Sequence, residues 1–455
     1  MDPVELAFAG LARQAELVRG GEVSPRELVE RSLERIERID PLLNSFRVVF
    51  AERALAEAKQ AEGRRGAGEE RPLLGVPIAI KDDTDVAGEV TGRGSRAAGG
   101  PAAKDAEMVR RLREAGAIVV GKTHVPELEQ WPFTETAAHG TTHNPWDTDR
   151  VPGGSSGGSG AAVAAALVPA ASGSDGAGSI RIPAACCGLF GLKPTRGRVP
   201  HPQGWHGLSV VGSLVRRTED ASLWLEVVAN GFERPAGPPG KLRIAVSKRF
   251  PPTVVSKLDP EMEAAFDATV SLLDELGHEV SEREPDLRLA QLDVTVRYLR
   301  GIRDDARSMA HPERLERRTK AMARMGSLIP EALFNKVLEN EERMVAQANA
   351  VFAWADVLLT PALARPAPRV GSWEGRGALG TVFGPGGVNA FTPYTPPWNA
   401  AGNPGASIPA GFSREGLPLA VQVVGRQMEE ATLIALAAQI EEARPWADRR
   451  PELAG

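Results

Sequence analysis

Residues 151–184 read V-P-G-G-S-S-G-G-S-G-A-A-V-A-A-A-L-V-P-A-A-S-G-S-D-G-A-G-S-I-R-I-P-A. Two glycine-serine segments, 151–160 and 173–184, flank a run of small apolar residues. Glycine at this density is costly in conformational entropy and usually marks unusual backbone dihedrals or the close approach of a ligand. The run between them is too short and too rich in alanine to span a bilayer. It predicts a buried helix over 159–167, followed by a strand over 169–175.

A second strand and helix precede this stretch. Residues 73–82, L-L-G-V-P-I-A-I-K-D, form a short run of β-forming residues that ends on a lysine, Lys81. Residues 105–115 predict an amphipathic helix closed by Gly116, and residues 117–121 predict the next strand. Alternating strands and helices indicate an α/β fold around a mixed sheet.

The N-terminal residues predict helices. Ser24-Pro25-Arg26-Glu27 has the form of a capping box with proline at the first helical position. We expect a helix from about Pro25 to Ile39, and expect the stretch rich in Ala, Glu and Lys to continue as helix up to about Gly68. Later in the chain, strands are predicted at 242–246, 356–360 and 419–425, and a helix at 429–443.

No Pro/Ser linker, tandem repeat or charge block divides the chain, so we predict a single elaborated domain over residues 1–455. Its predicted parts are an N-terminal helical region (1–70), a core that holds both glycine-serine segments (71–230), a mostly helical insertion that covers one face (287–355), and a C-terminal part of the core (356–455).

Composition narrows the class of protein. Hydrophobic residues make up 42% and charged residues 25%, which is typical of a soluble globular protein. Lys and Arg total 54 against 59 Asp and Glu, so no basic excess exists to neutralise phosphates or anionic lipid. We therefore expect no nucleic-acid or membrane partner, and a monomer or homodimer that acts on a small molecule.

The two cysteines, Cys186 and Cys187, are adjacent in a small apolar stretch. A disulfide framework needs separated pairs, and a metal site needs ligand spacing that is lacking here. We interpret both as core thiols and expect no metal or other cofactor. The first residues carry charges within any window long enough for a signal peptide, so we expect a cytoplasmic protein.

Cleavage of an amide by a serine hydroxyl sets three requirements. A base must take the hydroxyl proton, preorganised N–H groups must stabilise the oxyanion, and the leaving amine must receive a proton. The seven histidines lie in no recognisable triad context. A lysine can be the base if burial favours its neutral form, and Lys81, which closes an apolar strand, is placed for that role.

Several segments together resemble the amidase signature family over most of the chain. They are residues 75–82 (G-V-P-I-A-I-K-D), 144–147 (N-P-W-D), 152–159 (P-G-G-S-S-G-G-S), 174–195 (S-D-G-A-G-S-I-R-I-P-A-A-C-C-G-L-F-G-L-K-P-T), 398–411 (W-N-A-A-G-N-P-G-A-S-I-P-A-G) and 416–426 (G-L-P-L-A-V-Q-V-V-G-R). The resemblance implies a free-standing bacterial amidase with a large mixed central β-sheet flanked by helices on both faces. It also implies a Ser-cisSer-Lys triad.

By this resemblance Ser179 is the nucleophile, Ser155 is the bridging serine after a cis peptide bond, and Lys81 is the base. Water then hydrolyses the acyl-enzyme. The resemblance also implies that four consecutive backbone N–H groups form the oxyanion hole, those of Gly176, Ala177, Gly178 and Ser179.

Residues beside the triad are given supporting roles. Ala177 stands where the family usually has glycine, so alanine would add strain there if the position required a positive φ. Asp175 and Arg181 flank the loop, and we interpret them as a structural ion pair or hydrogen-bond brace. Ser156 is expected to support the geometry.

Two alternatives compete with this interpretation. G-G-S-S-G also fits the G-x-S-x-G pattern of a nucleophile elbow, with Ser155 as nucleophile, but residues 144–152 before it predict no strand. The chain could instead be the amidase subunit of a tRNA-dependent amidotransferase. Its segment 315–326, L-E-R-R-T-K-A-M-A-R-M-G, looks like free-standing bacterial amidases, which favours the stand-alone enzyme.

The substrate is less well defined by the sequence. Candidate pocket residues are aromatic or amide side chains in two loops, Gln130, Trp131, Tyr394, Trp398 and Asn399. An apolar pocket with aromatic walls would suit aryl or long acyl amides. Family relatives make oligoamides, carbamates (urethanes) and esters further candidates.

Overall fold

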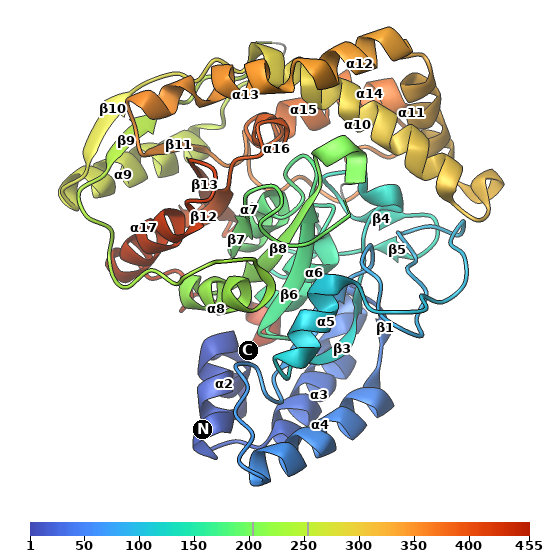
Figure 1. Ribbon diagram of the computed structural model, residues 1–455, viewed down its shortest axis with the longest axis vertical. Helices are drawn as coiled ribbons and strands as arrows, with labels where there is room; N and C mark the ends of the chain where they lie inside the picture. The colour runs from blue at the N-terminus through green and yellow to red at the C-terminus, as the bar shows by residue number, and fades with distance from the viewer. Residues whose placement is uncertain (203, 253) are drawn as a thin grey trace.

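The computed structural model describes residues 1–202, 204–252 and 254–455. These residues form an 11-stranded mixed sheet in the order β1-β3-β2-β6-β8-β7-β12-β13-β11-β9-β10, with helices on both faces (Figure 1). Pairs β2–β3, β2–β6, β9–β10 and β9–β11 are parallel, and the other pairs are antiparallel. The strands are β1 (Phe46–Val49), β2 (Pro77–Lys81), β3 (Ile118–Thr123), β6 (Ala170–Asp175), β7 (Phe190–Lys193), β8 (Val210–Val215), β9 (Arg243–Val246), β10 (Glu279–Glu282), β11 (Val357–Pro361), β12 (Gly405–Phe412) and β13 (Pro418–Gly425). The predicted α/β class with a mixed sheet is confirmed.

The N-terminal region is helical, as predicted, but not continuously. Ser24 Oγ accepts a hydrogen bond from the Glu27 N–H at 3.0 Å and caps α3, which ends before Asn44 in the left-handed conformation. Strand β1, which was not predicted, then pairs with β3 and separates α3 from the next helix, whereas the stretch rich in Ala, Glu and Lys is helical up to Gly66, close to the predicted end. The segment F-R-V-V is short, and its β-propensity is realised only through pairing with a strand distant in sequence. The helices here are α1 (Pro3–Phe8), α2 (Leu11–Gly20), α3 (Pro25–Leu43) and α4 (Ala51–Gly66).

The centre of the molecule is built from residues 151–187. Helix α6 (Gly157–Ala164) is buried at every residue and contacts β6, and α7 (Arg181–Cys187) packs on α6 and on β7, β12 and β13. Small side chains allow this close packing, because a Cβ on Gly160 would lie 3.2 Å from Pro183 Cβ. Both cysteines are buried and free, and burial raises the pKa of each thiol. The expectation of core thiols is therefore confirmed.

Other helices lie around this core. Helix α8 packs on β8 and β7, α17 packs on α8 and β13, and α9 packs on β13 and β11. Their bounds are α5 (Glu107–Glu114), α8 (Thr218–Val228), α9 (Pro260–Glu275) and α17 (Glu430–Ala443). A separate hairpin is formed by β4 (Glu135–Thr136) and β5 (Gly140–Thr141). The predicted later strands and the C-terminal helix are present within one or two residues of the expected bounds.

The predicted helical insertion forms a cover over the top of the molecule in Figure 1. It contains α10 (Arg288–Ser308), α11 (Arg317–Ser327), α12 (Glu331–Glu339) and α13 (Glu341–Asn349). Helix α10 contacts η2 (Gly204–Gly207) and α16 (Pro397–Ala400), and α11 contacts α14 (Ala378–Phe383), which precedes α15 (Val388–Phe391). Within the residues that the structure describes, no helix is both long and apolar enough to cross a membrane.

Candidate active site

The segment around Ser179 is the turn between β6 and α7. β6 ends at Asp175 and α7 begins at Arg181, so the intervening backbone carries its N–H groups at the N-terminal end of a helix. Gly178 has φ of 125°, in the region that favours glycine, and an added Cβ there would lie 2.2 Å from Thr395 Oγ1. Ala177 is not among the described residues with positive φ, so the strain considered for alanine at this position does not arise.

A buried ion pair holds this turn in place. Arg181 and Asp175 are both fully buried, and Arg181 Nη2 lies 2.9 Å from Asp175 Oδ1. Asn399 Nδ2 donates to the same carboxylate at 2.9 Å, and Asn399 Oδ1 accepts from Arg181 at 2.6 Å. Burial alone would raise the pKa of Asp175, but Arg181 and its other donors hold it well below the usual range. The carboxylate is therefore charged and fully enclosed by donors.

The Asp175 carboxylate also binds one of the N–H groups predicted to form the oxyanion hole. The Gly178 N–H donates to Asp175 Oδ1 at 2.6 Å, so it is not free to meet a substrate oxygen. The prediction of four available N–H groups is wrong for Gly178, because the carboxylate that braces the turn occupies it. Gly176, Ala177 and Ser179 remain as candidate donors.

Removing Arg181 should destabilise the protein strongly. Breaking one side of a buried ion pair leaves an uncompensated charge and costs about 3 to 5 kcal/mol. We expect Arg181→Met to lower the free energy of unfolding by this amount at pH 7, measured by equilibrium denaturation. Because Asp175 has a depressed pKa in the folded protein, the stability it contributes is present above its unfolded pKa and is lost as pH falls.

The matched control is Arg26→Met, which breaks an exposed pair with Glu30 and should cost less than about 1 kcal/mol. Equal small effects of the two substitutions would contradict the bracing role of Arg181.

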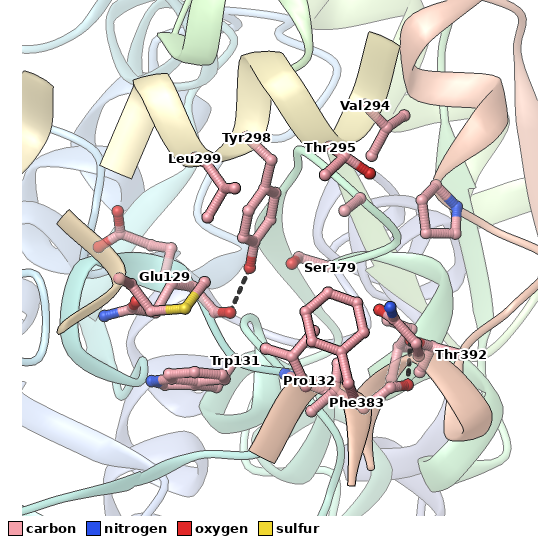
Figure 2. Close-up of a pocket in the computed structure, with 18 of the residues that line it drawn as sticks. Glu129, Trp131, Pro132, Ser179, Val294, Thr295, Tyr298, Leu299, Phe383 and Thr392 are labelled. Carbon is pink, nitrogen blue, oxygen red and sulfur yellow. Dashed lines mark hydrogen bonds between the residues drawn. The ribbon is translucent and has the colours of Figure 1, made fainter. Parts of the chain in front are cut away.

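An apolar pocket opens beside Ser179. It encloses about 820 Å³, counting the space at its open mouth. Figure 2 shows Tyr298 and Leu299 on one side of Ser179, and Trp131, Pro132 and Phe383 on the other. Its walls come from the loop at η1 (Glu127–Glu129), from α10 and α11 of the cover, and from the segment spanning α14 to α16. The pocket is lined by Glu129, Gln130, Trp131, Pro132, Ala177, Ser179, Ile182, Gln291, Val294, Thr295, Tyr298, Leu299, Met322, Met325, Val382, Phe383, Val388, Asn389, Thr392 and Pro396.

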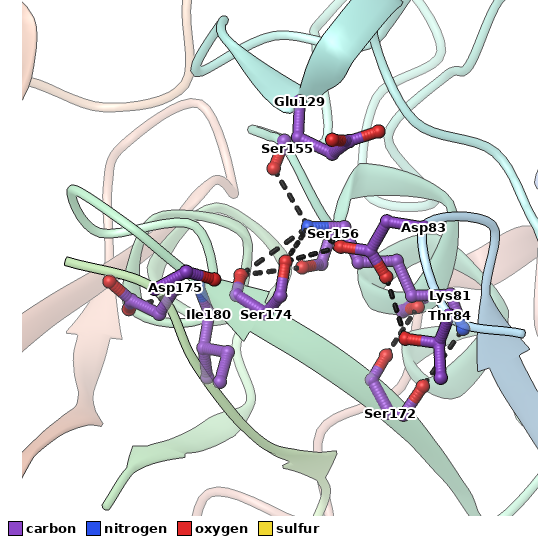
Figure 3. A network of polar contacts seen from close by, with 12 residues as sticks. Lys81, Asp83, Thr84, Glu129, Ser155, Ser156, Ser172, Ser174, Asp175 and Ile180 are labelled. Atoms are coloured by element: carbon purple, nitrogen blue, oxygen red, sulfur yellow. Dashed lines mark hydrogen bonds and ion pairs between the residues drawn. The ribbon is translucent and has the colours of Figure 1, made fainter. Parts of the chain in front are cut away.

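Lys81 lies at the end of β2 with no exposed surface. Its Nζ is 2.8 Å from Ser155 Oγ, 2.7 Å from Ser174 Oγ and 3.3 Å from the Ser174 carbonyl oxygen. Figure 3 shows Lys81 among these serines and Asp83. Strands β2 and β6 are neighbours, and the Lys81 N–H donates to Ser172 Oγ at 2.8 Å. Alternate residues of a strand share a face, so Ser172 and Ser174 lie along the lysine side chain.

A carboxylate completes the surroundings of this lysine. Asp83 Oδ2 lies 3.2 Å from Lys81 Nζ, and Asp83 also accepts hydrogen bonds from Ser174 Oγ and from Thr84 Oγ1, the latter at 2.8 Å. Burial would raise the pKa of Asp83, but the lysine and the two hydroxyl donors hold it at about 2. Asp83 is therefore a carboxylate next to the amine.

The loop before α6 brings Ser155 to the lysine. The Gly154–Ser155 peptide bond is cis. A Cβ on Gly154 would lie 2.6 Å from the Trp131 carbonyl oxygen, so only glycine fits there. Ser156 links the two glycine-serine segments, because its N–H donates to the Ser179 carbonyl oxygen at 3.3 Å and its Oγ donates to the Ser174 carbonyl oxygen at 3.4 Å.

A second, polar pocket is also lined by Ser179. Among the residues that the structure describes, it shares Ser179 and Glu129 with the apolar pocket. Glu129 is held by Arg93 at 2.6 Å, and burial raises the pKa of Glu129 to about 7. Within residues 1–202, 204–252 and 254–455, no group of three or more side chains suited to a metal ion is found. The polar pocket is lined by Asp83, Arg93, Glu129, Ser155, Ser174, Gly176, Ser179, His201, Pro202, Gly204, Trp205, Ser209 and Asp305.

Comparison with known proteins places this site in a family. The model of the Amidase family matches residues 27–434, which is most of the chain. The chain belongs to the amidase signature family. It is thus a hydrolase that acts on the carbon-nitrogen bonds of amides.

Individual members are similar over their whole length. A putative amidase, AmiB2, of Mycobacterium bovis is 49% identical over 464 residues, covering 100% of both chains. The solved structure of a 6-aminohexanoate cyclic dimer hydrolase is 32% identical with a TM-score of 0.89, covering 100% of both chains. A bacterial aryl acylamidase is 26% identical with a TM-score of 0.84, covering 96% of both chains.

The site residues predicted from the sequence of this amidase fall into two groups, those that lie at or next to the pockets beside Ser179 and those that do not. Ser155 and Ser179 line the polar pocket, Lys81 contacts Ser155 from the protein interior, and Gln130 and Trp131 line the apolar pocket. Three other predicted pocket residues line neither pocket at Ser179. Tyr394 donates to the Lys248 carbonyl oxygen, Trp398 packs against Phe352, and Asn399 braces Asp175. Their polar atoms and rings make contacts within the scaffold, and their role in substrate binding stays a prediction.

Other site residues of this amidase were not predicted. Asp83 was quoted in no motif, although K-D-D directly follows a buried strand and could have drawn attention to it. Ser174 could have been found from its alternation with Ser172 on one strand. The residues that α10, α11 and α14 contribute to the apolar pocket gave no signal, because helical spacing does not show which distant site a helix covers.

Proposed function

We propose that the chain cleaves small amides with apolar acyl or aryl groups through an acyl-enzyme on Ser179, using Ser155 and Lys81 to move the proton. The observation that carries this proposal is the fully buried Lys81 Nζ, 2.8 Å from the Oγ of Ser155, a residue that lines a pocket together with Ser179. A buried amine in contact with a hydroxyl is placed to exchange a proton with it.

In this mechanism Ser155 takes the proton from Ser179 and passes its own to neutral Lys81. The Ser179 Oγ forms a bond to the acyl carbon, and the oxyanion meets the N–H groups of Gly176, Ala177 and Ser179, each worth about 3 to 4 kcal/mol if well placed. The proton returns through Ser155 to the nitrogen as the C–N bond breaks. Water then attacks the ester and releases the acid.

The two pockets divide the substrate between them. Ser155 lines only the polar pocket, so the nitrogen that receives its proton leaves on that side. The acyl group then occupies the apolar pocket, where Trp131 and Phe383 offer aromatic surface. Carbamates, esters and oligoamides fall within the same proposal, because each presents an acyl carbon to the same nucleophile.

A substrate panel tests this function. Each buried methylene contributes about 0.8 kcal/mol, so benzoyl and hexanoyl anilides should exceed the acetyl anilide in kcat/KM by about 10-fold or more. Primary amides, aryl carbamates and esters complete the panel. Phe383→Ala should reduce this preference, whereas Trp354→Ala, at an exposed site outside the pocket, should not. A preference for acetyl or charged acyl groups would contradict the assignment of the apolar pocket.

A further inference from the structure

The amine of Lys81 is surrounded by more acceptors than a neutral base requires. A neutral amine has two N–H donors and one lone pair, whereas an ammonium has three donors. Ser155 Oγ, Ser174 Oγ and Asp83 Oδ2 all lie within 3.2 Å of Nζ. This set of three partners matches an ammonium, with the carboxylate supplying the opposite charge.

Ser174 fixes the direction of the hydrogen bonds between Lys81 and Asp83. Its hydroxyl donates to Asp83, so its oxygen lone pairs face Lys81 Nζ and accept from it. The carboxylate thus contacts the amine both directly and through Ser174. Thr84 Oγ1 donates to the other Asp83 oxygen at 2.8 Å and fixes the rotation of the carboxylate. Both carboxylate oxygens are therefore committed, and Asp83 is held in one position against the lysine.

We propose that Asp83 is a positioning residue of the proton relay, which stabilises the Lys81 ammonium and so sets the pH at which the enzyme becomes active. This inference rests on the proposed role of Lys81 as the base. When Ser179 attacks, one proton passes from Ser179 to Ser155 and one from Ser155 to Nζ, which becomes an ammonium beside the carboxylate. The same proton count reverses when the leaving nitrogen is protonated, so Asp83 itself neither gains nor loses a proton.

The resting enzyme is affected by the same contact. An opposite charge within about 4 to 6 Å favours the charged form of a group by about 1 to 3 pH units. Removing the negative charge of Asp83, 3.2 Å from Nζ, should therefore move the pH at which the reaction sets in. A stronger base also removes the serine proton more readily once it is free.

Other charged groups face the lysine from neighbouring elements. Glu129, from the loop at η1, and His201, from the loop after β7, line the same pocket, and burial lowers the pKa of His201. Glu129 is paired with Arg93 instead of with the lysine, and Arg93 also binds Asp305 at 2.6 Å. Of these carboxylates, Asp83 is the one that contacts the amine.

The test is the pH dependence of kcat/KM in Asp83→Asn, which keeps the size and the hydrogen-bond acceptor but removes the charge. We expect its acid limb to move to lower pH by about 1 unit or more, and its plateau to fall about 10-fold or more. The matched control is Asp85→Asn, which changes an exposed carboxylate two residues away and should reproduce the wild-type profile. Glu129→Gln should move the acid limb less than Asp83→Asn does.

An acid limb of Asp83→Asn that superimposes on the wild-type limb, or a larger movement in Glu129→Gln, would overturn the inference. Should Asp83→Asn fail to fold by circular dichroism, Asp83→Ser carries the same expectations. If Lys81→Ala is inactive and the pH profile of kcat/KM in Asp83→Asn does not move, only the role of Asp83 is rejected. An active Lys81→Ala with its acid limb intact would instead reject the proposed base.

Discussion

Ser179→Ala should abolish amide turnover while the protein remains folded. Ser179 is the one residue besides Glu129 that lines both pockets, and it follows the candidate N–H donors Gly176 and Ala177. Loss of a serine nucleophile costs about 10⁶-fold in kcat in a comparable hydrolase, so we expect a loss of at least about 10⁴-fold here. The measurement is steady-state hydrolysis of a benzoyl anilide, with circular dichroism to confirm the fold.

The control for this substitution is Ser271→Ala on the exposed face of α9, which should retain the wild-type rate. Retention of more than a small fraction of activity in Ser179→Ala, with contamination excluded, would remove Ser179 as the nucleophile.

Lys81→Ala should have an effect of similar size, because no other described side chain contacts both Ser155 Oγ and Asp83. Acylation should slow by at least about 10³-fold, since activation of the nucleophile and protonation of the leaving amine are both lost. The acid limb of kcat/KM should also flatten, because the group that must lose its proton is gone. Lys81→His offers a base with the wrong reach and should recover little.

A buried lysine on the next strand provides the matched control. Lys122 on β3 is fully buried and lies 3.0 Å from Asp82 Oδ1, but its hydrogen bonds go to Val90 and Thr91 and not to Ser155. Lys122→Ala should lower stability while the folded enzyme keeps its acid limb. An acid limb that survives unchanged in Lys81→Ala would show that another group is the base.

Much of the fold follows from local sequence patterns. The capping box at Ser24, the alternation of strands and helices, and the apolar run after Gly160 predict elements that the structure contains. Strand β1, which was not predicted, and helix α7 form through contacts with other parts of the folded chain. F-R-V-V forms a strand because β3 lies beside it, and residues 181–187 form a helix because Asp175 accepts the N–H groups of Ile180 and Arg181.

The residues of the candidate site could be predicted where a single segment has its own sequence signal. They could not be predicted where the site depends on contacts between segments. Lys81, Ser155 and Ser179 each lie in a segment with its own glycine or strand signal. The loss of Gly178 as an oxyanion donor depends on the rotamer of Asp175, which no sequence pattern specifies. The ion pair of Lys81 with Asp83 depends on how the chain turns after β2.

The residues of the apolar pocket were also hard to predict, because they come from segments far apart in the sequence. Its walls join a loop near residue 130 with helices more than 150 residues later, such as α10 and α11. Tyr298 donates to the Gln130 carbonyl oxygen and so fastens the cover to that loop. Such contacts between distant segments arise only from the folded chain.

The identity of the nucleophile is tested most directly by covalent labelling. A fluorophosphonate or sulfonyl fluoride should inactivate the enzyme and add a single mass label to the intact protein. Peptide mapping by tandem mass spectrometry should place that label on Ser179, and Ser179→Ala should take up none. A label on Ser155, with Ser179 unmodified, would contradict the proposed nucleophile and favour the nucleophile-elbow alternative.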